Sequence, residues 1–212
     1  MRGRDIKRYK YDFADLYLIS TFPSLKIDIE EYPAVKNHLL SFGYDRLKQT
    51  GEIGARKKTN NKWFETQDSI SYWDDFYKPK IIYPNMTKFL PFVYDYNGFL
   101  TNQKCFIITG NQVAFLTSFF NSSLFKYCFR DNFPELQGGT RELSKIFFDK
   151  IPVVKITDEI NSEFQKLVIE MQDLIIKQKT TQELELEIDR KIFDLYSLTE
   201  AEKQAIGFIE IQ

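Results

Sequence analysis

Residues 92–110 read FVYDYNGFLTNQKCFIITG, an Asn-Gly pair between two stretches rich in aromatic and β-branched residues. Glycine tolerates the positive φ of a tight turn, so the pattern predicts a β-hairpin across Asn97-Gly98. Thr109-Gly110-Asn111 ends the second strand, and a helical spacing follows at Val113, Leu116, Phe119 and Phe120. A buried hairpin beside a buried helix predicts an α+β fold with a mixed sheet and packed helices.

Shorter elements are predicted before this centre. Leu16-Tyr17-Leu18-Ile19 is a candidate strand, and Val35, Leu39 and Leu40 indicate one face of a helix that ends at Gly43. Ile81-Ile82-Tyr83 is a second short strand, and we expect the flanking Lys80 and Lys88 to lie on the surface. After the centre, the chain is expected to re-enter the core at Ile146-Phe147-Phe148.

The sequence changes character at Thr157, where apolar residues begin to recur every three or four positions. This spacing predicts two amphipathic helices interrupted at Thr180-Thr181. Thr199 and Glu202 form a capping box for a last helix with Ala205, Ile206 and Ile209 as apolar positions. We expect the helices to fold back as a hairpin on the domain or to dock against a neighbouring domain.

Charge divides the chain at the same place. Residues 157–212 hold 6 Lys and Arg against 13 Asp and Glu, whereas residues 1–156 hold 23 against 17. The predicted organisation is therefore a domain of residues 1–156 that faces an anionic partner and an acidic helical spacer of residues 157–212.

Composition excludes several classes of protein. No run of about 18 apolar residues occurs, so no transmembrane span is expected, and no signal peptide is recognisable. Cys105 and Cys128 lie in apolar segments and indicate reduced core thiols of a cytoplasmic protein. One histidine, His38, and two cysteines so placed do not predict a metal site.

Catalytic motifs are also missing from the sequence. There is no Walker loop, no Gly-x-Gly-x-x-Gly, no Gly-x-Ser-x-Gly and no Glu-x-Lys triplet of a metal-dependent nuclease. The acidic pair Asp74-Asp75 lies in a polar segment where carboxylates are usually solvated. We therefore assign no catalytic residue.

Two polar segments stand out as candidate contacts for a ligand. Residues 46–62 carry six cations among glycines and asparagines, with almost no apolar residue, which is typical either of a solvated loop or of a basic loop that binds phosphates. Trp63 follows and is expected to anchor this loop to the core rather than to stack on a base. Residues 133–141 form the second, glycine-rich segment.

The order of motifs resembles that of a known family. The motifs are Arg2-Gly3-Arg4-Asp5-Ile6-x-x-Tyr9, Trp63-Phe64-Glu65-Thr66, Lys78-Pro79-Lys80-Ile81-Ile82, Asp95-x-x-Gly98, Leu116-Thr117-Ser118-Phe119-Phe120-Asn121-Ser122, Ile151-Pro152-Val153 and Glu187-Ile188-Asp189-x-x-Ile192-Phe193-x-Leu195-Tyr196-x-Leu198-Thr199. Together they resemble the TaqI-like C-terminal specificity domain, the target-recognition domain of type IIG restriction-modification enzymes and adenine-specific DNA methyltransferases.

This resemblance implies a protein that reads double-stranded DNA and leaves the chemistry to other domains. In such enzymes a methyltransferase domain uses S-adenosylmethionine and an Asn-Pro-Pro-Tyr/Phe motif, and a Mg²⁺-dependent nuclease domain cuts the DNA. The nearest string here, Tyr83-Pro84-Asn85-Met86, has the wrong order. We therefore expect the chain to require no cofactor of its own and to act with those domains, in the same polypeptide or in a partner subunit.

The resemblance and the charge pattern together give candidate contact residues. Phosphate contacts are expected from Arg2, Arg4, Lys7, Arg8, Lys48, Lys57, Lys58, Lys62, Lys88 and Lys104. Base readout is expected from Arg56, Gln67, Gln137 and Arg141, with Gly138 and Gly139 allowing close approach of the loop backbone. Two alternatives remain: a protein-interaction module acting through its C-terminal helices, and a self-contained nuclease with an unrecognised site.

Overall fold

The computed structural model describes residues 1–208, apart from the side chain of Arg130. The chain forms two compact units. Residues 1–15 and those from Asp74 onward form the larger one, here the core unit, and residues 16–73 form the smaller one, here the insert unit. This division differs from the expected boundary between residues 156 and 157, which stays a prediction.

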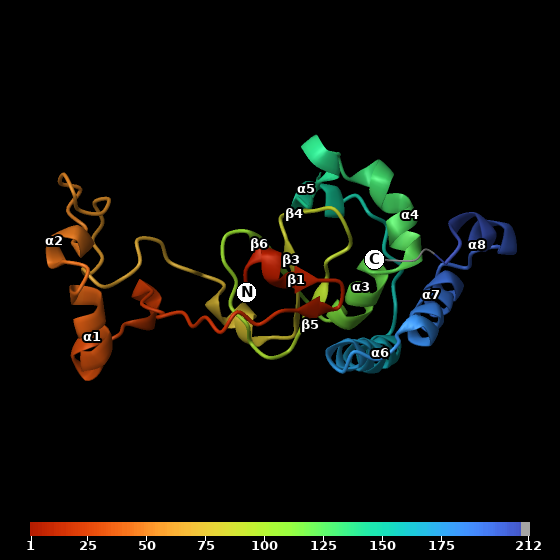
Figure 1. The fold of residues 1–212 in the computed structure, drawn as a ribbon, viewed down its shortest axis with the longest axis horizontal. Helices are drawn as coiled ribbons and strands as arrows, with labels where there is room; N and C mark the ends of the chain where they lie inside the picture. The colour runs from red at the N-terminus through yellow and green to blue at the C-terminus, as the bar shows by residue number, and fades with distance from the viewer. Residues whose placement is uncertain (209–212) are drawn as a thin grey trace. The chain divides into compact units, whose positions relative to one another are not determined.

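A three-stranded antiparallel sheet lies at the centre of the core unit (Figure 1). Its middle strand is β3 (Lys80–Pro84), which pairs on one side with β5 (Val93–Asp95) and on the other with β6 (Cys105–Thr109). All five residues of β3 are buried. A strand with a neighbour on each side and a cover on each face has to be apolar, and Ile81-Ile82-Tyr83 meets that demand.

The predicted hairpin across Asn97-Gly98 is wrong in its pairing. Gly98 does take the positive φ expected of it, +77°. The strands on either side, however, do not pair with each other, because β3 lies between them and takes both as partners. The sequence analysis placed these two strands correctly. It did not predict that the third, more apolar strand lies between them and pairs with both.

Helices cover the sheet and build the core. α3 (Val113–Phe120) packs on β3 and β5, and α4 (Ser123–Asn132) follows it. α6 (Asp158–Ile176) packs on α3, and α7 (Gln182–Leu195) packs on α4 and α6. Aromatic rings fill the space between them, among them Phe92, Phe115, Phe125, Phe164 and Phe193.

The C-terminal helices start where the sequence predicts. The Thr157 side chain accepts a hydrogen bond from the Ile160 nitrogen at the start of α6, and Thr199 and Glu202 form the capping box of α8 (Glu200–Ile206). Ile209 lies outside the described residues. Of the two predicted arrangements, the described helices adopt the first, since α6 and α7 pack back on the core unit.

Smaller elements complete the core unit. They are the 3₁₀ turns η1 (Gly3–Asp5), η4 (Trp73–Tyr77, which begins in the insert unit) and η5 (Gln137–Gly139), the ribbon β1 (Ile6–Lys7) with β2 (Lys10–Tyr11), the ribbon β4 (Met86–Thr87) with β7 (Arg141–Glu142), and α5 (Lys145–Phe148). Re-entry into the core differs from the prediction in detail: Leu143 is fully buried, whereas Ile146 is exposed.

Cys105 and Cys128 are unbridged thiols, and burial raises the pKa of Cys105 to about 11.

The insert unit contains the 3₁₀ turns η2 (Pro23–Leu25) and η3 (Ile29–Glu31) and the helices α1 (Pro33–Leu40) and α2 (Tyr44–Leu47). α1 confirms the predicted helix. The strand predicted at Leu16–Ile19 is wrong: these residues form no strand in the described chain, and all four side chains are exposed. An apolar stretch becomes a strand only beside a partner strand, which residue type alone does not supply.

Candidate nucleic-acid interface

An open groove of about 660 Å³ lies in the core unit between the N-terminal segment, β4 and the start of β6. Its described lining contains five cationic side chains and no carboxylate: Arg2, Arg4, Lys7, Lys88 and Lys104. Asn85, Asn102, Thr87 and Thr140 add polar groups. The sequence assigned these five cations to phosphate contact, and the fold brings them together from three separate segments.

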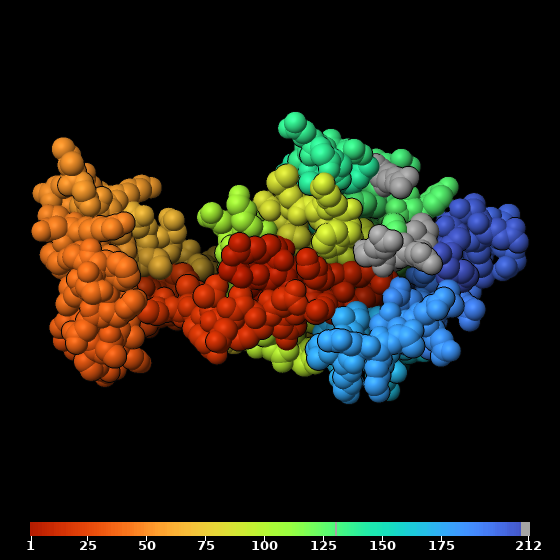
Figure 2. Space-filling view, viewed as in Figure 1, coloured from red at the N-terminus to blue at the C-terminus, as the bar shows by residue number. Residues whose placement is uncertain are grey.

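Close backbone packing builds the wall of the groove. A Cβ on Gly3 would lie 3.2 Å from both the Pro84 Cβ and the Lys104 carbonyl oxygen, so glycine lets the N-terminal segment lie directly on the end of β3. The Asn85 nitrogen donates to the Lys104 carbonyl at 2.9 Å, which joins the other two segments. Figure 2 shows the N-terminal residues, in red, at the surface beside the yellow segment that contains β4.

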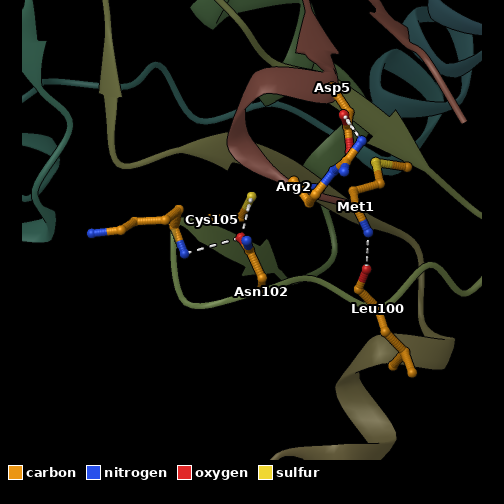
Figure 3. Close-up of polar contacts among 7 residues, drawn as sticks. Met1, Arg2, Asp5, Leu100, Asn102 and Cys105 are labelled. Carbon is orange, nitrogen blue, oxygen red and sulfur yellow. Dashed lines mark hydrogen bonds and ion pairs between the residues drawn. The ribbon is translucent and has the colours of Figure 1, made fainter. Parts of the chain in front are cut away.

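Arg2 is held within the protein as well as facing the groove. Its guanidinium forms two hydrogen bonds of 2.8 Å with the carboxylate of Asp5, which lies among the contacts of Figure 3. The Arg2 hydrogen bond is also the main reason that the pKa of Asp5 is lowered. Beside it, Asn102 accepts from the Lys104 nitrogen at 3.1 Å and fixes the turn into β6.

The remaining four cations of the groove are differently placed. Arg4, Lys7, Lys88 and Lys104 are exposed, and within the described chain none of them forms an ion pair. Lys7 lies over the Phe89 ring, 5.8 Å from its centroid. These exposed cations share one surface with apolar residues and with no carboxylate of the described lining, so the surface attracts a polyanion. The attraction acts over a distance set by the Debye length, about 8 Å at physiological salt.

The glycine-rich loop of residues 133–141 lies next to this groove. β4 pairs with β7 through Thr87↔Arg141, which fixes the end of the loop beside Thr140 in the groove wall. The Leu136 nitrogen donates to the Thr140 carbonyl at 2.7 Å and closes the loop. Gly138 and Gly139 both have a positive φ, +76° and +77°, with nothing within 4 Å of where a Cβ would be. Gln137 is exposed at this tip.

Arg141, predicted to read bases, is engaged inside that loop. It forms a 2.9 Å ion pair with Glu135, donates to the Phe133 carbonyl and lies over the Phe129 ring. Only 13% of the side chain is exposed. In this arrangement Arg141 holds the loop, and a base contact would require it to exchange those partners for DNA.

Arg8, predicted to bind phosphate, points into a buried polar cluster instead of the groove. Its guanidinium donates to the Asn121 carbonyl at 2.9 Å and pairs with Glu185 of α7 at 3.0 Å. Nearby, the Asp189 carboxylate accepts from the Ser123 nitrogen at 2.9 Å and from its hydroxyl at 2.5 Å, which caps α4. Burial raises the pKa of Asp189. The cluster joins the N-terminal ribbon to α4 and α7.

The basic loop of the insert unit is organised around a buried glutamine. The Gln49 amide donates to the carbonyls of Lys62 and Glu65 at 2.9 and 2.8 Å and accepts from Thr59 at 2.6 Å. Trp63 packs against the rings of Phe64 and Tyr44 within the insert unit, and its predicted role as an anchor rather than a stacking partner of a base stays a prediction.

The predicted contact residues of this loop fall into two groups. Lys57 and Lys58 are exposed, and no ion pair involves them in the part of the chain that the structure describes. The others have protein partners: Lys48 pairs with Asp45 and Glu52, Arg56 donates to the Glu65 carbonyl, Gln67 donates to the Lys57 carbonyl, and Lys62 donates to the Ile27 carbonyl.

One buried ion pair was missed from the sequence. Lys80, expected on the surface, is fully buried, and its ammonium pairs at 2.5 Å with the equally buried Asp95. Asp95 also accepts from the nitrogens of Asn97 and Phe99 at 2.9 and 3.0 Å. The sequence did contain a signal for the role of Asp95, because an aspartate two residues before Asn97 is a common start of a turn. The pair links β3 to β5 at its register position Lys80↔Asp95.

The described residues contain no group of three or more His, Cys, Asp or Glu that is able to hold a metal ion. None of their helices has the length and apolarity needed to cross a membrane. Comparison with protein families gives one finding: the model of the TaqI-like C-terminal specificity domain matches residues 1–153.

Proposed function

Because the chain belongs to the family of TaqI-like C-terminal specificity domains, we propose that it recognises a specific sequence in double-stranded DNA. The parent enzyme would be a type IIG restriction-modification enzyme that methylates adenine at N6. Methyl transfer from S-adenosylmethionine and Mg²⁺-dependent cleavage belong to other domains, in the same polypeptide or in a partner subunit. This chain supplies the choice of site.

The groove of the core unit is the observation that carries the proposal. Arg4, Lys7, Lys88 and Lys104 lie on one surface and form no ion pair with any residue that the structure describes, and Arg2 lies among them. Contacts from such cations to phosphates set the register of a protein on a duplex without reading its sequence. Lys48, Lys57, Lys58 and Lys62 of the insert unit are proposed to add phosphate contacts from a second surface.

Base readout is proposed for the loop tips rather than for the groove floor. Gln137 lies beside two glycines with open space around them, and its amide can donate and accept in the pattern that adenine presents in the major groove. Gln67 and Arg56 remain candidates in the insert unit. Arg141 remains a candidate for base readout, and Arg8 a candidate for phosphate contact, only if DNA replaces their present partners.

The alternative of a protein-interaction module is less well supported. The apolar stripes of α6 and α7 that suggested it are used within the core unit, where Phe164, Val168, Met171, Ile188 and Ile192 are almost fully buried. These five residues are therefore part of the core and are not available to a partner, whereas Ile169 and Ile176 of α6 remain exposed.

Salt-dependent DNA binding tests the proposal. The chain is mixed with a labelled pool of random-sequence duplexes, and the affinity is measured by mobility shift at several salt concentrations. We expect binding that weakens as salt rises, and enrichment of one sequence after repeated rounds of selection. No binding at low salt would contradict the proposal.

A matched pair of variants locates the interface. Lys88→Gln with Lys104→Gln removes two charges from the groove and should lower the slope of log affinity against log salt by about two units, roughly one for each lysine. Lys166→Gln with Lys179→Gln removes the same charge from exposed positions of the C-terminal segment and should leave the slope unchanged. Equal effects of the two pairs would place the interface elsewhere.

A further inference from the structure

The tip of the basic loop in the insert unit carries a fully exposed isoleucine. The relative exposure of Ile53 is 108%, so its side chain touches almost nothing of its own protein. Burying such a side chain against an apolar surface is favourable, and that gain in free energy is left unused here. A position that needed only a turn residue would be served equally well by a polar side chain.

The loop presents Ile53 in a defined turn. The Ala55 nitrogen donates to the Glu52 carbonyl at 3.0 Å, with Gly54 at the third position and a φ of +86°, as a type II turn requires. Below the tip, the Gly51 nitrogen donates to the Arg56 carbonyl and the Arg56 nitrogen to the Lys48 carbonyl, both at 3.0 Å. Buried Gln49 holds the base of the loop.

The charges around the tip select the kind of surface that can cover it. Residues 46–62 contain six cations and a single acid, Glu52, which Lys48 neutralises at 2.8 Å. Lys57 and Lys58 are exposed in the segment that follows the tip. An exposed apolar tip on a loop of net positive charge matches a partner that carries negative charge at its edges and apolar surface between them, and the groove of a DNA duplex has this arrangement.

We propose that Ile53 is an apolar DNA contact, carried into a groove by the basic loop and packed there against bases. Two base surfaces fit an isoleucine: the methyl group of thymine in the major groove, and the face of a base at an unstacked step. This inference rests on the proposed function, and it adds a contact made by apolar packing to contacts made by charge and hydrogen bonds.

Substitution of Ile53 tests the contact with little risk to folding, because the side chain is exposed. Ile53→Ser should lower affinity for the random duplex pool about tenfold, as expected when about half of a buried isoleucine contact is lost, and leave the salt slope unchanged. Ile53→Val, which keeps most of the apolar surface, should bind within about threefold of the parent chain. Lys57→Gln with Lys58→Gln serves as the opposite control, since it should lower the slope.

Modified duplexes then identify the base surface. If Ile53 touches thymine methyl groups, replacing thymine by uracil throughout the pool weakens binding of the parent chain but not of Ile53→Ser. If Ile53 enters an unstacked step, duplexes containing 2-aminopurine brighten when the parent chain binds and stay dim with Ile53→Ser.

Other results would overturn the inference in distinguishable ways. Unchanged affinity of Ile53→Ser, or a parent chain sensitive to neither modification, rejects the base contact, while salt-dependent binding of the parent chain still supports the proposed function. Failure of the folded parent chain to bind any duplex, with a native circular dichroism spectrum, rejects both.

Discussion

The interior of the core unit and its groove use the same residue types in opposite ways. Within the protein, Lys80 forms an ion pair with Asp95, Arg8 with Glu185 and Arg141 with Glu135. The exposed cations of the groove have no such partner among the described residues. Among these residues, the presence or absence of a carboxylate partner therefore separates the cations that stabilise the fold from the cations proposed to bind DNA.

The largest expected effect separates the two regions through stability. Lys80→Met leaves the Asp95 carboxylate buried without its cation and should lower the free energy of unfolding by about 3–5 kcal/mol. Lys88→Met, on the exposed side, should change it by less than about 0.5 kcal/mol. Chemical denaturation of both variants measures the difference, and a mild effect at Lys80 would mean that the Asp95 carboxylate is accessible to water in solution.

Arg141 allows a finer test of the comparison. Its contacts are those of an interior residue, but it lies in the loop that is proposed to contact DNA. Arg141→Ala should relax discrimination between the selected sequence and random duplexes by about 1–3 kcal/mol, through loss of the loop shape that presents Gln137. Charge reversal of Lys57 and Lys58 should instead weaken binding to all sequences alike. Competition assays with both duplexes distinguish the two, and identical behaviour would refute this division of roles.

The smallest expected effect concerns pH. Burial raises the pKa of Asp189 above its unfolded value, so the folded state binds the proton more tightly than the unfolded state. This group alone therefore makes the folded state less stable as pH rises through the interval between the two pKa values. Asp189→Asn removes that contribution, so the stability of the parent chain relative to this variant should grow as pH falls from 7 toward 4. A difference that stays flat over this range would show that Asp189 does not titrate there.

Much of the fold was readable from the sequence because it depends on local patterns. The helix after Thr157, the capping box at Thr199 and the α+β class follow from periodicity and cap chemistry, which act within a few residues. The pairing of β5 and β6 with β3 was not readable, since it depends on which strand is most apolar on both faces. Local signals at Asn97-Gly98 favoured the simpler hairpin.

The candidate site was readable only in part for a similar reason. The sequence marked Arg4, Lys7, Lys88 and Lys104 as cations, but the folded chain brings them to one groove through contacts between distant segments. It placed Lys80 on the surface because a lysine beside a strand is usually solvated. Burial of a charge depends on a partner, and Asp95 lies 15 residues away in sequence.

The cluster of Arg8, Glu185, Ser123 and Asp189 limits how this recognition domain can be exchanged between enzymes. Residues 1–153 match the family, yet α7 supplies two of the carboxylates that hold the N-terminal ribbon and the start of α4. A chimaera joined at residue 153 would strip these partners away and expose the aromatic face of α3. Grafts intended to transfer sequence preference should therefore carry the chain through at least Leu195, the end of α7.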